Sequence, residues 1–147
     1  MIAKISSTEN LGGALSYNFK KVEKGEANIL LAAELYQNRE GNYTMKDVLT
    51  DMKALIPETY RTKKMVFHCS LNPHPDEKLS DETLTQIAKE YMEELGYGKQ
   101  PYIVFKHNDI AREHIHIVSL RIDGEGKKIN DKFEKRRSKQ ITDALER

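Results

Sequence analysis

The segment that decides the fold is residues 101–122, PYIVFKHNDIAREHIHIVSLRI, in which two apolar runs flank a mainly polar stretch. Residues 101–106 and 115–122 are rich in β-branched and aromatic side chains, which favour strands, and the connecting residues 108–113 are mostly polar. Two such runs separated by a short loop predict an antiparallel β-hairpin. The other elements can be placed outward from this hairpin.

Three of the five histidines fall within this segment, at His107, His114 and His116. In a strand, side chains two residues apart point to the same face, so His114 and His116 project together, and the hairpin returns the chain beside His107. Three neutral imidazoles on one side of a divalent ion leave other positions for water or substrate, which is typical of a catalytic metal site. The alternative is that all three are surface or loop histidines without a ligand role, because a His-hydrophobe-His pair alone is only moderately specific.

Hydrophobic periodicity and cap residues predict the other elements. We expect strands at 1–5 and 64–71, an apolar stretch of mixed character at 27–35, and helices at 14–22, 45–56, 80–95 and 131–147. Residues 6–8, Ser-Ser-Thr, are the expected N-terminal cap of the first helix, and Gly12-Gly13 is expected to be either a break or a point of tight packing just before it. Together with the hairpin, these elements predict an α+β fold, with an antiparallel sheet and helices packed mainly on one face.

Composition limits the class of protein. The 147 residues suit one domain, and the chain has neither the roughly 20-residue apolar run of a membrane helix nor a secretory signal pattern. Its single cysteine, Cys69, excludes an internal disulfide and fits a reducing compartment, so we expect a cytoplasmic protein. The 24 Lys and Arg against 23 Asp and Glu give a net charge of +1, so any nucleic-acid surface must be local. Because the sequence ends inside a helical pattern, we expect residues 1–147 to be the N-terminal domain of a longer protein.

The chain resembles a known family in three places. Residues 107–118, with the pattern His-x-Asp-x4-His-Ile-His-Ile-Val, resemble the third motif of the conjugative relaxases, or mobilization nucleases, of the His-hydrophobe-His endonuclease superfamily. Residues 12–22, GGALSYNFKKV, are similar to the first motif, which carries the nucleophilic tyrosine, and residues 68–73 with 79–82 resemble the second. The three motifs follow the family's order and span nearly the whole chain.

The resemblance implies single-strand DNA chemistry on a central, about five-stranded sheet with a metal site on its open face. His107, His114 and His116 would hold a divalent metal, Mg²⁺ or Mn²⁺, although a histidine-only site also accepts zinc or nickel. Tyr17 would attack the scissile phosphate and form a 5′-phosphotyrosyl link to DNA. The free 3′-hydroxyl left behind could later reverse this step.

Acidic residues are the candidates for assisting this chemistry. Asp109, in the third motif, would either orient a ligating histidine or act as a base for Tyr17. Glu82 and Asp76 are weaker candidates for the same role. His68 is expected to be a hydrogen-bonded structural histidine rather than a fourth metal ligand.

Clusters of basic residues are the candidate DNA contacts, because Lys and Arg neutralise backbone phosphates. They lie in three groups, namely Lys20, Lys21 and Lys24 beside the expected nucleophile, Lys127 and Lys128 in a turn, and Lys135, Arg136 and Arg137 in the last helix. For the last group, an ordinary solvated helix face is the alternative.

The leading interpretation is a DNA relaxase that nicks one strand at a plasmid or transposon transfer origin for conjugative mobilization, together with accessory relaxosome proteins. One alternative is a rolling-circle replication initiator or a single-strand transposase. Such enzymes usually carry the tyrosine downstream of the histidine pair, whereas Tyr17 lies upstream. A second alternative is a non-catalytic DNA-binding module with the same fold.

Overall fold

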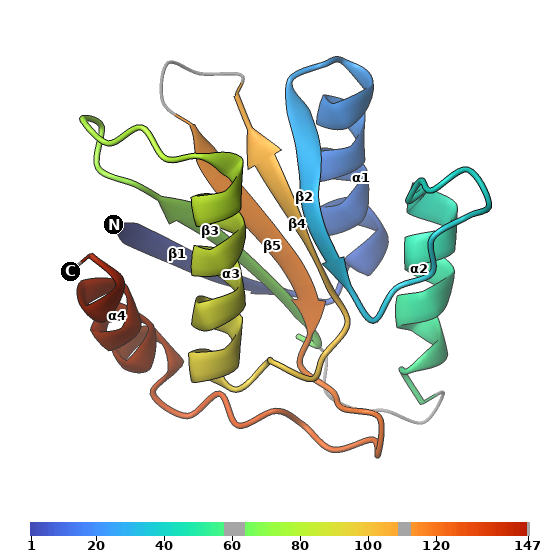
Figure 1. Ribbon diagram of the computed structural model, residues 1–147. Helices are drawn as coiled ribbons and strands as arrows, with labels where there is room; N and C mark the ends of the chain where they lie inside the picture. Colours follow the sequence, from blue (N-terminus) through green and yellow to red (C-terminus); the bar gives the residue numbers. More distant parts are fainter. Residues whose placement is uncertain (58–63, 109–112, 147) are drawn as a thin grey trace.

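The computed structural model describes residues 1–57, 64–108 and 113–146, which form one five-stranded sheet and four helices (Figure 1). The elements in chain order are β1 (Ile2–Thr8), α1 (Leu11–Glu23), β2 (Ala27–Ala33), α2 (Met45–Ala54), β3 (Val66–Asn72), α3 (Asp81–Leu95), β4 (Tyr102–His107), β5 (His114–Leu120) and α4 (Glu134–Leu145). Over the described ranges, no helix combines the length and the apolar character needed to cross a bilayer.

The sheet is antiparallel throughout, in the order β1-β3-β5-β4-β2. The predicted hairpin is formed by β4 and β5, with His107 opposite His114 and Phe105 opposite His116. The α+β class and the antiparallel five-stranded sheet are therefore confirmed. The stretch of mixed character becomes β2, an edge strand paired with β4.

Helices cover both faces of the sheet, two on each, where the sequence favoured mainly one face (Figure 1). Helices α3 and α4 pack against side chains such as Phe67 and Ile117, and α1 and α2 pack against Ile103 and Phe105 on the other face. The physical reason is that the central strands β4 and β5 are apolar on both faces, so each face needs a cover. The α1 face nevertheless stays partly open, because Ile2, Lys4 and Ser6 of β1 are exposed on it.

The start of α1 differs from the predicted cap. Thr8 still belongs to β1, and the cap is Asn10, whose side chain accepts a hydrogen bond from the Gly13 backbone N–H at 2.9 Å. Gly12 and Gly13 lie inside the helix, so they do not break it, and Gly13 is instead the point of tight packing that the sequence also allowed. A Cβ atom at Gly13 would come within 2.4 Å of the Asn10 side chain, so this cap favours glycine there.

Buried polar groups anchor α4, which begins at Glu134 rather than at Asp131. The Glu134 carboxylate is buried, accepts a hydrogen bond from the Tyr97 hydroxyl at 2.7 Å and is paired with the buried guanidinium of Arg121. One turn later, the hydroxyl groups of Ser138 and Tyr91 lie 2.6 Å apart. These contacts pair the buried charge of Glu134 with that of Arg121 and hold α4 in place beside β1.

Candidate active site

The hairpin brings His107, His114 and His116 together on the α1 face of the sheet. One ring nitrogen from each lies within 4.8 Å of those of the other two. The rings of His107 and His116 stack with their centroids 3.9 Å apart, and the His114 centroid lies 5.2 Å from that of His107 and 5.0 Å from that of His116. The convergence expected from the strand spacing is confirmed.

This set of donors fits a divalent metal. Two nitrogens bound to one ion at about 2.0–2.1 Å lie at most about 4.2 Å apart, so the observed spacing requires only small side-chain rotations. Burial lowers the pKa of His116 to about 2, and nearby His107, His68, His114 and Lys21 act in the same direction. A ring that stays neutral keeps a lone pair for a metal.

Asn18, which sequence reasoning did not single out, controls the protonation of His107. The buried Asn18 side chain donates from Nδ2 to the Ala14 carbonyl at 2.9 Å, which directs Oδ1 towards His107 Nε2 at 2.7 Å. Nε2 must then carry the proton, so Nδ1 carries the lone pair. The available signal was a polar residue within the apolar stripe of α1, between Leu15 and Phe19.

His68 is a hydrogen-bonded histidine, as expected, and its partner is a member of the cluster. Its Nε2 lies 3.2 Å from Nδ1 of His116 across the β3–β5 pair. Burial lowers the pKa of His68 as well. Because Nδ1 of His116 takes part in this bond, Nε2 is the ring nitrogen that could bind a metal.

Helix α1 places Tyr17 beside the histidines. Its ring centroid lies 6.0 Å from those of both His107 and His116, and 6.4 Å from that of His68. The side chain is 48% exposed, and the Lys21 ammonium lies 5.4 Å from the ring centroid. The tyrosine is thus both near the cluster and open to a large substrate.

The three expected acidic residues have different outcomes. Asp76 is exposed in the loop after β3, 3.6 Å from the His74 ring nitrogen Nδ1, and is not part of the histidine cluster. Asp109 lies outside the described residues. Glu82 is exposed in the first turn of α3, which covers the opposite face of the sheet from the histidines. Its neighbour Asp81 binds Lys106 at 2.6 Å on that face. The structure therefore does not bring Glu82 to the histidine cluster.

The basic residues occupy three separate places. Lys20 and Lys21 lie in the last turn of α1, the helix that carries Tyr17, and Lys24 is the residue at its C-terminal cap. Lys127 and Lys128 follow the turn after β5 and face Glu125 and Asp131, at 3.8 and 3.2 Å.

The third group of basic residues, on α4, contains side chains with different roles. Lys135 and Arg136 are exposed on α4. The guanidinium of Arg137 instead donates to three backbone carbonyls, those of Leu95, Asn130 and Lys132. Arg137 therefore stabilises the local fold, and we do not propose that it contacts DNA.

Comparison with family models places the chain in a known family. A family model described as "Relaxase: MobA/VirD2-like, nuclease domain" matches residues 17–147. The matched range includes Tyr17, Asn18 and the three clustered histidines. No curated protein matches the chain.

Proposed function

Because the chain belongs to the relaxase family with a MobA/VirD2-like nuclease domain, we propose that it nicks one strand of DNA at a plasmid or transposon transfer origin, with Tyr17 as the nucleophile. The observation that carries this proposal is the placement of the Tyr17 ring 6.0 Å from the rings of His107 and His116. We also propose that it acts together with accessory proteins that help to open the origin.

The residues that would hold the metal are His107, His114 and His116. A bound divalent ion would supply positive charge that neutralises and polarises the scissile phosphate. The Tyr17 oxygen attacks phosphorus, the bond from phosphorus to the 3′ oxygen breaks, and the phenolic proton ends on that oxygen. The products are a 5′-phosphotyrosyl ester and a 3′-hydroxyl, and the ester preserves the bond energy for rejoining.

The chain's other groups have supporting roles in the proposal. Asn18 and His68 hold the imidazoles through the hydrogen bonds described above. Asp109 remains the proposed residue for orienting a ligand or accepting the proton, whereas the place of Glu82 across the sheet favours no such role. Lys20 on α1 and Lys24 at its C-terminal cap are exposed and are proposed to contact phosphates near the cleaved bond.

A denaturing gel tests the function. Purified protein is incubated with Mn²⁺ and overlapping single-stranded oligonucleotides that cover the DNA flanking its gene. A 3′-labelled strand should become a slow, protease-sensitive band, and the same strand with a 5′ label should give a shorter free fragment. Shifted binding on a native gel without either product would indicate a non-catalytic module. Two free fragments would indicate hydrolysis, and either result contradicts the proposal.

Asn18 offers a separate prediction about metal affinity. Replacing it with leucine removes the acceptor for His107 Nε2, so we expect Mn²⁺ binding to weaken by about 10- to 100-fold. Asn18→Asp keeps an acceptor at the same distance and should stay much closer to the wild-type affinity. Calorimetry measures both, and thermal melting checks that each variant is folded. Unchanged affinity in Asn18→Leu would show that this hydrogen bond does not prepare His107 for a metal.

A further inference from the structure

Phe133 has an unusual conformation for a large apolar residue. It directly precedes α4, its side chain is 60% exposed and its φ angle is 54°, in the left-handed region. Bulky residues rarely adopt this region, and such strain persists only where neighbouring structure enforces it. The enforcing neighbour is Glu134, fixed by Arg121 and Tyr97. The ring is therefore held rigidly towards solvent.

Two cations flank the Phe133 ring. Lys132 Nζ lies 5.5 Å and Arg136 Cζ 5.1 Å from its centroid. Cation–π contacts at exposed sites are weaker than the stacking of a nucleic-acid base on an aromatic ring. A base can therefore take the place of these cations on the ring, and the displaced cations are then close enough to meet its phosphates.

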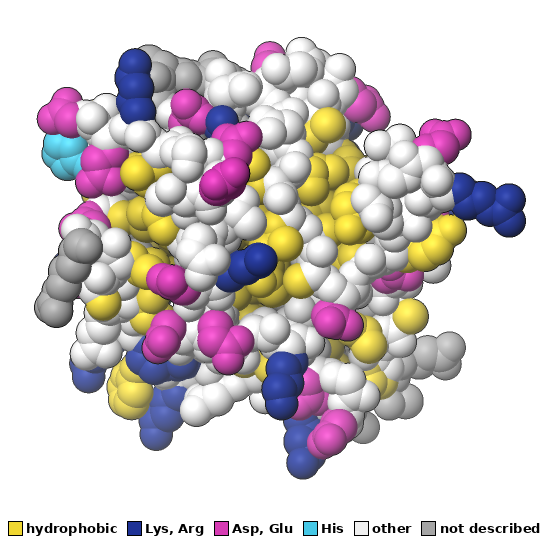
Figure 2. Space-filling view, viewed as in Figure 1, with side chains coloured by type: hydrophobic (Ala, Val, Ile, Leu, Met, Phe, Trp, Pro, Cys, Tyr) yellow, Lys and Arg dark blue, Asp and Glu magenta, His cyan; other side chains and the backbone are white. Residues whose placement is uncertain are grey.

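A hollow of about 620 Å³ adjoins Phe133. Its lining includes Ser6, Ser7, Lys64, Lys135 and Arg136. On the face shown in Figure 2, Lys and Arg side chains gather along the lower edge of the molecule, around the lower end of α4. Shape, an exposed ring and positive charge therefore coincide at one place.

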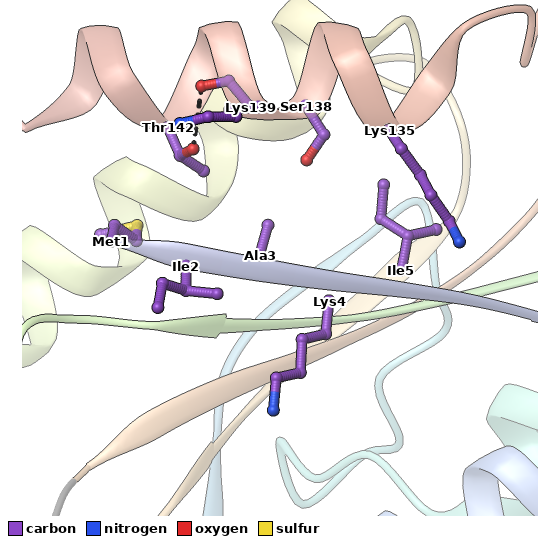
Figure 3. Close-up of a pocket in the computed structure, with 9 residues that line it drawn as sticks. All are labelled: Met1, Ile2, Ala3, Lys4, Ile5, Lys135, Ser138, Lys139 and Thr142. Atoms are coloured by element: carbon purple, nitrogen blue, oxygen red, sulfur yellow. Dashed lines mark hydrogen bonds between the residues drawn. The ribbon is translucent and has the colours of Figure 1, made fainter.

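This hollow continues along the edge strand. A second hollow of about 510 Å³ lies between β1 and α4 and shares Ile5 and Lys135 with the first (Figure 3). Figure 3 shows Lys135 reaching down from α4 beside Ile5, while Lys4 extends from β1 away from the helix. The carboxylate of Asp143 nearby is paired with Lys139 at 3.3 Å. The groove is thus bordered by several cations, and the two carboxylates in its lining, those of Asp131 and Glu134, are paired with Arg121.

The groove lies on the α4 side of β1, whereas the histidine cluster lies on the opposite, α1 face of the sheet. The Ser6 hydroxyl donates to the His68 carbonyl at 3.3 Å, and the His68 ring bonds to His116. Strands β5, β3 and β1 are successive neighbours, so two strand spacings, about 10 Å, separate the cluster from β1. A DNA strand that leaves the groove must pass around β1, the edge strand, to the partly open half of the α1 face, where Lys4 and Ser6 are exposed.

We propose that this groove binds a second segment of single-stranded DNA, outside the cleaved bond, with one base stacked on Phe133 and phosphates against Lys64, Lys135 and Arg136. The proposal rests on the proposed function for its substrate class. In this proposal Phe133 anchors the DNA strand, while the histidines and Tyr17 act on a phosphate farther along the same DNA strand.

The absence of tryptophan from the chain provides a direct test. Phe133→Trp introduces a single indole, and a base stacked on it should quench its fluorescence. The probe is a dT20 oligonucleotide in EDTA, so that binding is measured without cleavage. Tyr36→Trp is the matched control, because Tyr36 is similarly exposed, at 55%, away from this groove. We expect saturable quenching of the indole at position 133 and none at position 36.

A second measurement tests the affinity of the protein for dT20. Phe133→Ala should weaken dT20 binding, followed by fluorescence anisotropy, by about 5- to 150-fold, and Phe133→Tyr should restore most of it. Thermal melting identifies any variant that is not folded, and the tryptophan experiment does not depend on Phe133→Ala.

The possible outcomes separate this proposal from the proposed function. Nicking without quenching at position 133 overturns the groove and leaves the nuclease intact, whereas quenching without nicking supports the groove and contradicts the nuclease. Equal quenching by blunt duplex DNA, or quenching by poly-glutamate and not by dT20, overturns base stacking as the mode of binding.

Discussion

Replacing Tyr17 with phenylalanine is expected to abolish the covalent protein–DNA product. The substitution removes one oxygen atom and keeps the ring that lies 6.0 Å from those of His107 and His116. No other atom of the side chain can act as a nucleophile, so the rate of strand cleavage should fall by at least roughly 1000-fold. The 3′-labelled strand on a denaturing gel gives the measurement.

The control for this variant is Tyr36→Phe, which makes the same change at another exposed tyrosine. It should form the covalent band at the wild-type rate. Tyr17→Phe should also bind Mn²⁺ normally, since no ligand is changed. A covalent band that persists in Tyr17→Phe would mean that a different side chain attacks the phosphate.

The double substitution His114→Ala and His116→Ala is expected to remove metal binding. It leaves one of three clustered ring nitrogens, and even partners that only hydrogen-bond to a ligand are worth about 10- to 100-fold in affinity. The loss should therefore exceed roughly 1000-fold, so that calorimetric titration with Mn²⁺ shows no heat of binding. Cleavage should be lost together with it.

The matched control for the histidines is His74→Ala. His74 is an exposed loop residue that accepts a hydrogen bond from the Asp76 backbone N–H at 3.2 Å, and it is not in the cluster. It should leave metal binding and cleavage unchanged. Wild-type Mn²⁺ affinity in the folded double variant would show that the ligand set is wrong.

Much of the fold follows from local sequence pattern. The runs at 101–106 and 115–122 define the hairpin, and the apolar stripe before Gly96 defines α3, because strand and helix periodicities are properties of short segments. The convergence of His114 and His116 follows from the same periodicity of two. The distribution of helices between the two faces did not follow, because it depends on which apolar stripe meets which side of the sheet.

The candidate active site likewise combines features that the sequence indicated with features that only packing produces. Tyr17 was indicated by a resemblance, and its position beside the histidines depends on how α1 packs. Asn18 and His107 are 89 residues apart in sequence, and His68 and His116 are 48 apart, so neither hydrogen bond has a local signal. Glu82 seemed suitable from its motif, yet the sheet separates it from the cluster.

The sequence by itself determined every strand except β2, together with the hairpin and the three histidines on one face, because alternation along a strand fixes which way each side chain points. Only the tertiary structure decided which tyrosine and which amide join them, and that Phe133 is held outward beside a basic groove. These features arise from burial. Helix α1 covers part of one face with its apolar stripe, and Arg121 and Tyr97 hold Glu134, the first residue of α4, in the protein interior. Packing of this kind depends on many contacts between residues that are far apart in the sequence, so no short segment encodes it.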